Sequence, residues 1–369
     1  MRVFRRVLAL AIAAFSVLLL GPVVSPASAS TTVGSVYVLS NQVAGNSVIE
    51  YARGVDGDLT IAGTFATGGN GTSGGLGSQG AVIIDQYERY LYAVNAGSNT
   101  ITSFRIAAAG GLTLVGTVAS GGTTPTSVTT FGRYLYVLNA GGTGNITGFS
   151  VSDGVLSPLA GSTRDLSGSG TSPAQVSFAP DGRCLLVTER ATNRIDLYQV
   201  GTDGLATGPS VTPAPGVTPF GFDFDRRGHV IVSEAFGGAV DGSAVSSLAV
   251  PFIGGISVIS ASVPTTETAA CWIATTVDGR FAYAGNAGGS ISGFSIATDG
   301  TITLITPGGK TATGAAGLTD LADSRDSRFL YARTGNGTVS GFVIASNGSL
   351  TPLAPAPGLP AGAAGITAR

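Results

Sequence analysis

One phrase recurs seven times along this chain and constrains its fold more than any other feature. It combines a strand of the YLYAV kind, a short polar turn and a second strand of the ITSF kind. The copies begin near Ser35, Arg89, Arg133, Arg183, His229, Arg280 and Arg328. This is a spacing of roughly 45 to 50 residues, and self-similarity at such a period is typical of propeller blades.

Each copy divides into four short strands. Alternating apolar positions and many β-branched and aromatic residues favour strands over helices. Turn pairs such as Asp181-Gly182 and Asp203-Gly204 fall where a four-stranded antiparallel meander needs them. The 57 glycines and the charged fraction of only 11% fit many short strands and tight turns. We therefore predict an all-β fold, a seven-bladed β-propeller of four-stranded antiparallel blades, as a single domain over residues 30–369.

The two ends of the chain are predicted to meet in one blade. The first copy lacks its first strand, whereas the tail ends in GAAGIT at residues 362–367. A nearly identical run, GAAGLT, appears at residues 314–319 in the seventh copy. We expect the C-terminal strand to complete the first blade and close the ring, which removes the open edges of an incomplete blade.

The N-terminus has the features of a signal peptide over residues 1–29. Arg2, Arg5 and Arg6 precede an apolar run at residues 7–20, and Ala27-Ser28-Ala29 is a small-residue cleavage site. We expect a secreted protein, extracellular or associated with the cell wall. An uncleaved membrane anchor is the alternative, although the apolar run is short for a membrane span. General secretory and twin-arginine export both remain open.

Composition argues against several classes of function. The net charge of −2 gives no electrostatic footprint for nucleic acid or an anionic membrane. One histidine and two separated cysteines make a zinc site improbable, and no phosphate loop or dinucleotide fingerprint is present. We predict no cofactor, no metal and no membrane span after signal cleavage, and we expect a monomer. Cys184 and Cys271 can form a single bridge or remain buried thiols.

The fourth and fifth copies break the pattern at one position. The second strand ends in asparagine in four copies, where this residue suits a turn: Asn41, Asn95, Asn139 and Asn286. The fourth and fifth copies carry Glu189 and Glu234 there. Paired carboxylates are candidate acid–base catalysts, and Arg190 and Arg194 are close enough in sequence to neutralise them. The alternative is a structural ion pair between two blades.

A second comparison concerns the start of the first, innermost strand of each copy. The equivalent positions are approximately Ala81, Ser127, Gln175, Gly221, Trp272, Asp320 and Ala368. Gln175, Trp272 and Asp320 are the candidates for ligand binding. Trp272 is either a stacking platform for a ring or packing that plugs the channel. We expect any site at the channel mouth between the fourth and fifth blades. His229 falls at the opposite end of its strand from Glu234, so we expect no role for it.

The repeats resemble the seven-bladed lactonase family, which includes propeller-type 6-phosphogluconolactonases and carboxy-muconate lactonising enzymes. The similar phrases are YLYVLNAG, SNTITSF, the PDGR turn, and TERATNRIDLY at residues 188–198. The resemblance covers nearly all of the mature chain. It implies the propeller fold and a small-molecule site at the channel mouth.

The family's catalytic positions differ in this chain. A His-x-His phrase in active members matches residues 174–176, and an Arg-His pair matches Phe220-Gly221. The family's acidic residue is matched by Glu234, and an arginine is replaced by Ala287. The resemblance thus implies a protein that binds a small-molecule lactone, a sugar or a surface partner with most of the catalytic set missing. An active lactone hydrolase or cycloisomerase that uses Glu189, Glu234 and the arginines is the first alternative. A structural cell-surface repeat protein is the second.

Overall fold

The computed structural model describes residues 31–251, 255–314 and 317–369. The predicted signal peptide lies outside the described residues. No helix in the described ranges is long and apolar enough to cross a membrane.

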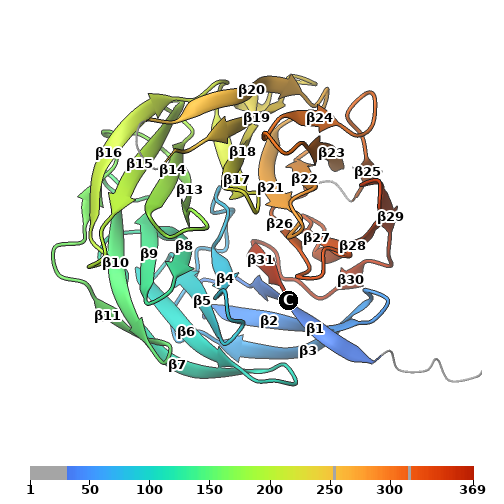
Figure 1. Cartoon of the computed structure of the whole chain (residues 1–369). Coiled ribbons are helices and arrows are strands. Elements are labelled where there is room, and N and C mark those ends of the chain that lie inside the picture. Colours follow the sequence, from blue (N-terminus) through green and yellow to red (C-terminus); the bar gives the residue numbers. More distant parts are fainter. Residues whose placement is uncertain (1–30, 252–254, 315–316) are drawn as a thin grey trace, which may run out of the picture.

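Seven antiparallel sheets are arranged in a ring around a central axis (Figure 1). The first three blades contain β1 (Thr32–Leu39), β2 (Ser47–Gly54), β3 (Leu59–Ala66), β4 (Val82–Ile84), β5 (Tyr90–Asn95), β6 (Thr100–Ile106), β7 (Leu112–Ala119), β8 (Pro125–Phe131), β9 (Tyr134–Asn139), β10 (Asn145–Ser152), β11 (Val155–Pro158) and β12 (Arg164–Asp165). The fourth and fifth blades contain β13 (Pro173–Phe178), β14 (Cys184–Glu189), β15 (Arg194–Val200), β16 (Ala206–Pro213), β17 (Pro219–Phe224), β18 (His229–Glu234), β19 (Ala244–Ala249) and β20 (Ser257–Pro264).

The sixth and seventh blades contain β21 (Ala270–Thr275), β22 (Phe281–Asn286), β23 (Ser290–Ile296), β24 (Ile302–Leu304), β25 (Ala312–Thr313), β26 (Leu321–Asp323), β27 (Phe329–Arg333), β28 (Thr338–Ile344), β29 (Leu350–Pro352) and β30 (Ala356–Pro357). In three blades the outer strand is split into two pieces that pair with the same neighbour, as β11 and β12 do with β10. The predicted all-β propeller of seven four-stranded blades is confirmed.

The C-terminal strand closes the ring. β31 (Ala364–Ala368) is the innermost strand of the first blade and pairs antiparallel with β1 (Figure 1, red beside blue). The predicted alignment of the tail is wrong in detail. Ala368 pairs with Val36, whereas Leu39 pairs with Ala364. Ala368 therefore lies at the end of the channel opposite to the one predicted, because GAAGIT runs into β31 whereas the matching GAAGLT precedes β26.

The repeated phrase is explained by contacts between neighbouring blades. The buried tyrosine of the second strand donates its hydroxyl to a turn glycine in the next blade, as Tyr136 does to the Gly204 carbonyl (2.8 Å) and Tyr283 to the Gly348 carbonyl (2.9 Å). Gly204 has a φ of +81°, and a Cβ there would lie 2.2 Å from the ring of Tyr134. The aromatic strand and the Asp-Gly or Asn-Gly turn are thus two halves of one interface.

Candidate functional site

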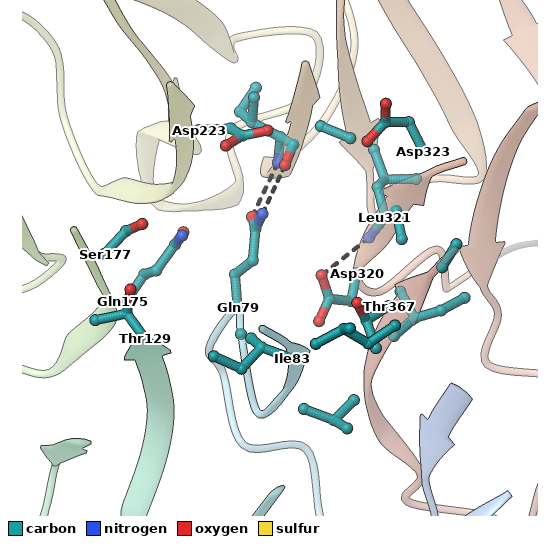
Figure 2. A pocket seen from close by; sticks show the side chains of 18 of the residues that line it. Gln79, Ile83, Thr129, Gln175, Ser177, Asp223, Asp320, Leu321, Asp323 and Thr367 are labelled. Atoms are coloured by element: carbon teal, nitrogen blue, oxygen red, sulfur yellow. Dashed lines mark hydrogen bonds between the residues drawn. The ribbon is translucent and has the colours of Figure 1, made fainter. Parts of the chain in front are cut away.

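The innermost strands of all seven blades enclose a cavity of about 410 Å³ on the central axis (Figure 2). We call it the channel cavity. It is lined by residues of β4, β8, β13, β17, β21, β26 and β31. No single blade forms this cavity, because each contributes only one short strand to its wall.

One end of the channel cavity is closed by a segment that precedes β4. Gln79 extends across the axis to β21, where its Nε2 donates to the Ile273 carbonyl (2.6 Å) and its Oε1 accepts from the Ile273 N–H (3.0 Å) (Figure 2). Its own N–H donates to the Ala174 carbonyl of the fourth blade (3.1 Å). The adjacent Ser78 hydroxyl donates to the Thr126 carbonyl of the third blade (2.8 Å). The segment is therefore bound to three blades at once.

Trp272 and Phe220 complete this closure. The Trp272 indole N–H donates to the Ser78 carbonyl (3.0 Å), and its ring meets Phe220 edge to face with centroids 5.2 Å apart. Trp272 is only 7% exposed. We call Ser78, Gln79, Phe220 and Trp272 the seal. The structure thus places Trp272 in channel packing rather than on an open wall where a ring could stack on it.

The other end of the channel cavity faces solvent. Val277 at this end is 50% exposed, and Arg325 is exposed as well. The Arg325 guanidinium is held 3.0 Å from the Glu88 carboxylate and donates to the Gln86 carbonyl (2.8 Å). The opening therefore lies on the face that carries the turns between first and second strands. The site predicted from Glu189 and Glu234 lies at the opposite face.

Three aspartates line the cavity: Asp223, Asp320 and Asp323 (Figure 2). Asp223 is fully engaged, since it accepts hydrogen bonds from the Thr275 N–H (2.9 Å), the Thr275 hydroxyl (2.7 Å) and the Phe224 N–H (2.8 Å). The three do not form a metal centre: among the described residues no group of three or more His, Cys, Asp or Glu is arranged to hold a metal ion.

Asp320 is only partly engaged. Its Oδ1 accepts from the Leu321 N–H (2.9 Å), whereas its buried Oδ2 has no hydrogen-bond partner among the described residues. Asp320 is 3% exposed, and its carboxylate turns toward the Gln79 side chain, which crosses the axis (Figure 2). Burial raises the pKa of Asp320 to about 7, although the charge of Arg333 counteracts part of this effect. The backbone φ of +74° is unusual for a residue other than glycine.

Asp323 lies nearer the open end and also has an unpartnered Oδ2. Burial, and next the negative charge of Asp223, raise its pKa well above the ordinary range. Burial thus favours the protonated form of Asp323, whereas Asp320, with a pKa of about 7, is close to half ionised at neutral pH. A carboxylate accepts hydrogen bonds, and a protonated carboxyl also donates one.

Gln175 lines the cavity but is occupied by the neighbouring blade. Its Nε2 donates to the Phe222 carbonyl (2.8 Å), and its Oε1 accepts from the Phe222 N–H (2.8 Å). The Gln175 amide therefore pairs with the backbone of Phe222 as a neighbouring strand would, and the Gln79 amide pairs with the backbone of Ile273 in the same way. Of the three inner-strand candidates predicted, only Asp320 has a side-chain atom without a hydrogen-bond partner among the described residues.

Glu189 and Glu234 are both fully buried, and the structure does not bring them together as a pair. The Glu234 carboxylate accepts from the Ser246 hydroxyl (2.6 Å) and the Ser262 hydroxyl (2.7 Å), and burial raises its pKa. It makes the kind of contact that Asn286 makes in the sixth blade, where the side-chain amide donates to the hydroxyls of Ser290 and Ser292.

The neighbour of Glu189 is Asp196, a residue that the sequence did not single out. The Ser167 N–H donates to both carboxyls, at 2.9 Å to Glu189 and 3.0 Å to Asp196. Glu189 also accepts from the hydroxyls of Ser167 and Thr192. Burial raises the pKa of Asp196 to about 8, helped by the Glu189 charge. Burial also acts to raise the pKa of Glu189, but its hydrogen bonds outweigh this and lower it overall. One proton is thus held on Asp196 at neutral pH.

The predicted arginines do not neutralise these carboxylates through ion pairs within the described residues. The Arg190 Nε donates to the Ser172 carbonyl (3.0 Å), and its guanidinium stacks 5.0 Å from the Phe220 ring centroid. Arg194 is exposed and donates to the Ser167 hydroxyl (3.2 Å).

The remaining candidates lie elsewhere. The His229 Nδ1 is 2.9 Å from the buried Asp225 carboxylate, at the end of β18 opposite to Glu234. Cys184 and Cys271 are buried free thiols whose pKa values burial raises to about 11 and about 12.

The positions that match the family's catalytic residues lie at the sealed end. The Ala174 carbonyl accepts the Gln79 N–H, and Phe220 is part of the seal. At Gly221 a Cβ would lie 2.0 Å from the Gln79 Oε1. A larger side chain at Gly221 would therefore displace Gln79 from Ile273, so the seal and a side chain at this position exclude each other.

Comparison with known proteins agrees with the architecture. Residues 35–164, the first three blades, match the family model described as "Lactonase, 7-bladed beta-propeller". No curated protein sequence matches the chain significantly. A periplasmic gluconolactonase of Pseudomonas aeruginosa has a similar structure, with a TM-score of 0.71 and 18% identity over 91% of this chain and 98% of the other.

Two Bacteroides proteins with provisional 6-phosphogluconolactonase descriptions are similar as well. The protein from Bacteroides uniformis has a TM-score of 0.72 and 16% identity over 91% of this chain and 99% of its own. The protein from Bacteroides fragilis has a TM-score of 0.70 and 18% identity over 94% and 100%. At such identities the structures establish the fold alone. The chain is thus a seven-bladed β-propeller whose first three blades are similar to the lactonase family.

Proposed function

We propose that this protein is a secreted lactonase-like propeller that binds a small, neutral, polyhydroxylated molecule, a sugar or a sugar lactone, in the channel cavity without converting it. One observation carries the proposal: Asp320 and Asp323 line the same polar cavity, and each has a buried carboxyl oxygen without a hydrogen-bond partner among the described residues. Buried polar groups in folded proteins nearly always have partners, so two orphaned oxygens in a shared cavity indicate a missing one.

The chemistry of the cavity favours hydroxyl groups. Each hydroxyl of a sugar donates one hydrogen bond and accepts others, which suits a wall that carries Asp320 and Asp323, because burial raises the pKa of both carboxyls. The three aspartates of the lining disfavour an anionic ligand, because like charges repel. The volume of about 410 Å³ is within the usual range for small-molecule pockets.

The contents of the channel support binding without turnover. The sole histidine, His229, is bound to Asp225 at a turn and does not line the cavity. The positions that match the family's catalytic set hold Ala174, Gln175, Val176, Phe220 and Gly221. The seal also blocks approach from that end.

A lactone hydrolase is the second candidate, and one observation favours it. A carboxyl with a pKa of about 7 inside a cavity is suited to general base catalysis near neutral pH. In that case Asp320 would activate a water molecule that attacks the lactone carbonyl. The structural cell-surface alternative requires the channel cavity to bind nothing.

Calorimetric titration with a panel of monosaccharides and lactones, including glucono-δ-lactone, tests the proposal. We expect saturable binding by the wild type and at least about tenfold weaker binding by Asp320→Asn, since a charge-assisted hydrogen bond is lost. The matched control is Asp299→Asn, which alters an exposed turn aspartate outside the cavity. Equal binding by Asp320→Asn and the wild type, or no binding to any compound of the panel, would refute the channel proposal.

Lactone hydrolysis followed in a pH-stat separates the two candidates. Turnover that is lost in Asp320→Asn would establish the hydrolase. If turnover is lost in Glu234→Gln while Asp320→Asn stays active, Glu234 rather than Asp320 is the catalytic carboxylate.

Release into the medium with an N-terminus at Ser30 tests secretion, and light scattering after gel filtration tests the expected monomer.

A further inference from the structure

We infer that a second site, separate from the channel, binds a small organic anion that carries a carboxylate or phosphate group. The site is a groove of about 250 Å³ on the second blade, next to a turn of the third blade. We call it the arginine groove. It is lined by Arg89, Tyr90, Arg105, Ile106 and Asp153.

Two arginines of the arginine groove share one tyrosine ring. The guanidinium carbons of Arg89 and Arg105 each lie 5.7 Å from the centroid of the Tyr90 ring, and Arg105 also donates to the Tyr90 hydroxyl (3.3 Å). Tyr90 is 5% exposed, whereas both arginines are exposed. An aromatic ring attracts a cation but does not cancel its charge. The two positive charges that meet in the groove therefore favour a shared anion.

The acidic residues near the groove do not neutralise this charge. Asp85 is buried, and its Oδ1 accepts the N–H groups of Arg89 (2.6 Å) and of the next residue (2.8 Å). Glu88 is paired with Arg325 at 3.0 Å. Asp153 lines the groove, but within the described residues no carboxylate is at ion-pair distance from either groove arginine. Two arginines against one aspartate leave a net positive lining on a chain whose net charge is −2.

The charge of Arg89 is unbalanced because its turn departs from the repeat. Three other copies carry an aspartate two residues before the turn arginine: Asp181, Asp278 and Asp326. In the sixth blade the Asp278 carboxylate lies 2.7 Å from the Arg280 Nε and pairs with it. The second copy has Tyr87 at this position, and Arg89 stacks 5.4 Å from its ring centroid. An aromatic residue thus holds the guanidinium in place without supplying a counter-charge.

Arg105 is the second departure from the repeat. It lies directly opposite Tyr90 on the neighbouring strand β6. The equivalent positions in the sixth and seventh blades are uncharged, with Ser295 opposite Phe281 and Val343 opposite Phe329. One blade therefore lacks the usual negative charge and carries an added positive charge at the same place.

The size and the chemistry of the groove indicate the ligand. Its volume is slightly below the usual range of about 300–1,000 Å³ for small-molecule pockets, so it suits a single anionic group. Guanidinium groups bind carboxylate and phosphate through paired hydrogen bonds. Tyr87 is 59% exposed beside Arg89 and offers an aromatic surface to the rest of the ligand. A sugar acid or a sugar phosphate has both parts.

NMR titration of the 15N-labelled full-length protein with inorganic phosphate, and separately with glucuronate, tests the inference at constant ionic strength. We expect saturable shifts of the Ile106 and Asp153 amides with at least one of the two anions, and the anion that binds identifies the ligand group. The double variant Arg89→Gln/Arg105→Gln should weaken that binding at least about tenfold. The matched control is Arg280→Gln, an exposed arginine of the equivalent turn in the sixth blade that does not line the groove.

A further variant keeps both arginines. Tyr87→Asp restores the aspartate of the other copies, which should pair with Arg89 as Asp278 does with Arg280 and weaken anion binding about three- to fivefold. Unchanged binding in this variant or in the double variant, equal weakening by Arg280→Gln, or no saturable shift with either anion would overturn the inference. Asp320→Asn should leave anion binding unchanged. A loss of anion binding in Asp320→Asn would also overturn the inference, because it would place the anion in the channel.

Discussion

Two sets of buried carboxyl groups in this propeller differ in whether all their oxygens have hydrogen-bond partners. Glu189 and Glu234, on the fourth and fifth blades, accept hydrogen bonds from nearby serine and threonine hydroxyls. Asp320 and Asp323, in the channel cavity, each keep one oxygen without a partner. The first set replaces the asparagine of the repeat at the same position and with the same kind of partner. A departure from a repeat can therefore be structural, whereas an unsatisfied group in a cavity indicates a ligand.

The largest effect should come from removing a satisfied carboxylate. Glu234→Ala leaves the Ser246 and Ser262 hydroxyls without an acceptor and opens a cavity, so we expect a loss of about 3 kcal/mol in the free energy of unfolding. Urea denaturation measures it. Glu234→Gln, which keeps the shape and one acceptor oxygen, should lose about 1 kcal/mol. A Glu234→Ala protein as stable as the wild type would break the comparison.

A smaller, pH-dependent effect is expected at Asp196. Its pKa is about 8 when folded against an ordinary value of 3.8, so the folded protein binds a proton that the unfolded chain has released. The free energy of unfolding therefore falls as pH rises from about 4 to about 8. Asp196→Asn carries a permanent N–H donor toward Glu189 and should gain about 1–3 kcal/mol over the wild type between pH 5 and pH 8.

Parallel urea titrations at the two pH values test this effect. Asp203→Asn is the matched control, since that aspartate is exposed and the amide keeps an oxygen that accepts the Leu205 N–H. The same pH profile in wild type and Asp196→Asn would show that no proton is held by the pair.

Asp320→Asn should raise the free energy of unfolding at pH 8 by about 1–3 kcal/mol, in the opposite direction to Glu234→Ala. The wild-type carboxyl, with a pKa raised to about 7, costs stability as pH rises from about 4 to about 7, and the amide removes part of this cost. Thermal unfolding at pH 8 should show the variant more stable. A loss comparable to that of Glu234→Ala would mean that Asp320 is a structural group.

The smallest effect is expected at Arg194. Its guanidinium is exposed and reaches only the Ser167 hydroxyl at 3.2 Å, so Arg194→Ala should alter the free energy of unfolding by less than about 0.5 kcal/mol. A larger loss in urea denaturation would show that the charge acts on the pair of Glu189 and Asp196 over a longer range.

The candidate site was only partly predictable. Asp320 was found by comparing equivalent positions around the ring, yet its neighbours at the same position proved to be structural: Gln175 binds Phe222 and Trp272 binds Ser78. Asp323 gave no signal, because a single aspartate in a short strand differs little from the turn aspartates that the repeats contain. Asp196 was missed for the same reason, since only the loop at Ser167 shows that it faces Glu189.

The sequence by itself determined the propeller. Seven copies of a strand–turn–strand phrase can bury their aromatic faces only against one another, and the incomplete first copy requires the tail to close the ring. Only the tertiary structure decided where chemistry is possible. Gln79 precedes the second blade but ends on Ile273 of the sixth, so which end of the channel is open depends on a contact across the axis. Local patterns cannot encode such a contact, because its two partners are far apart in the chain.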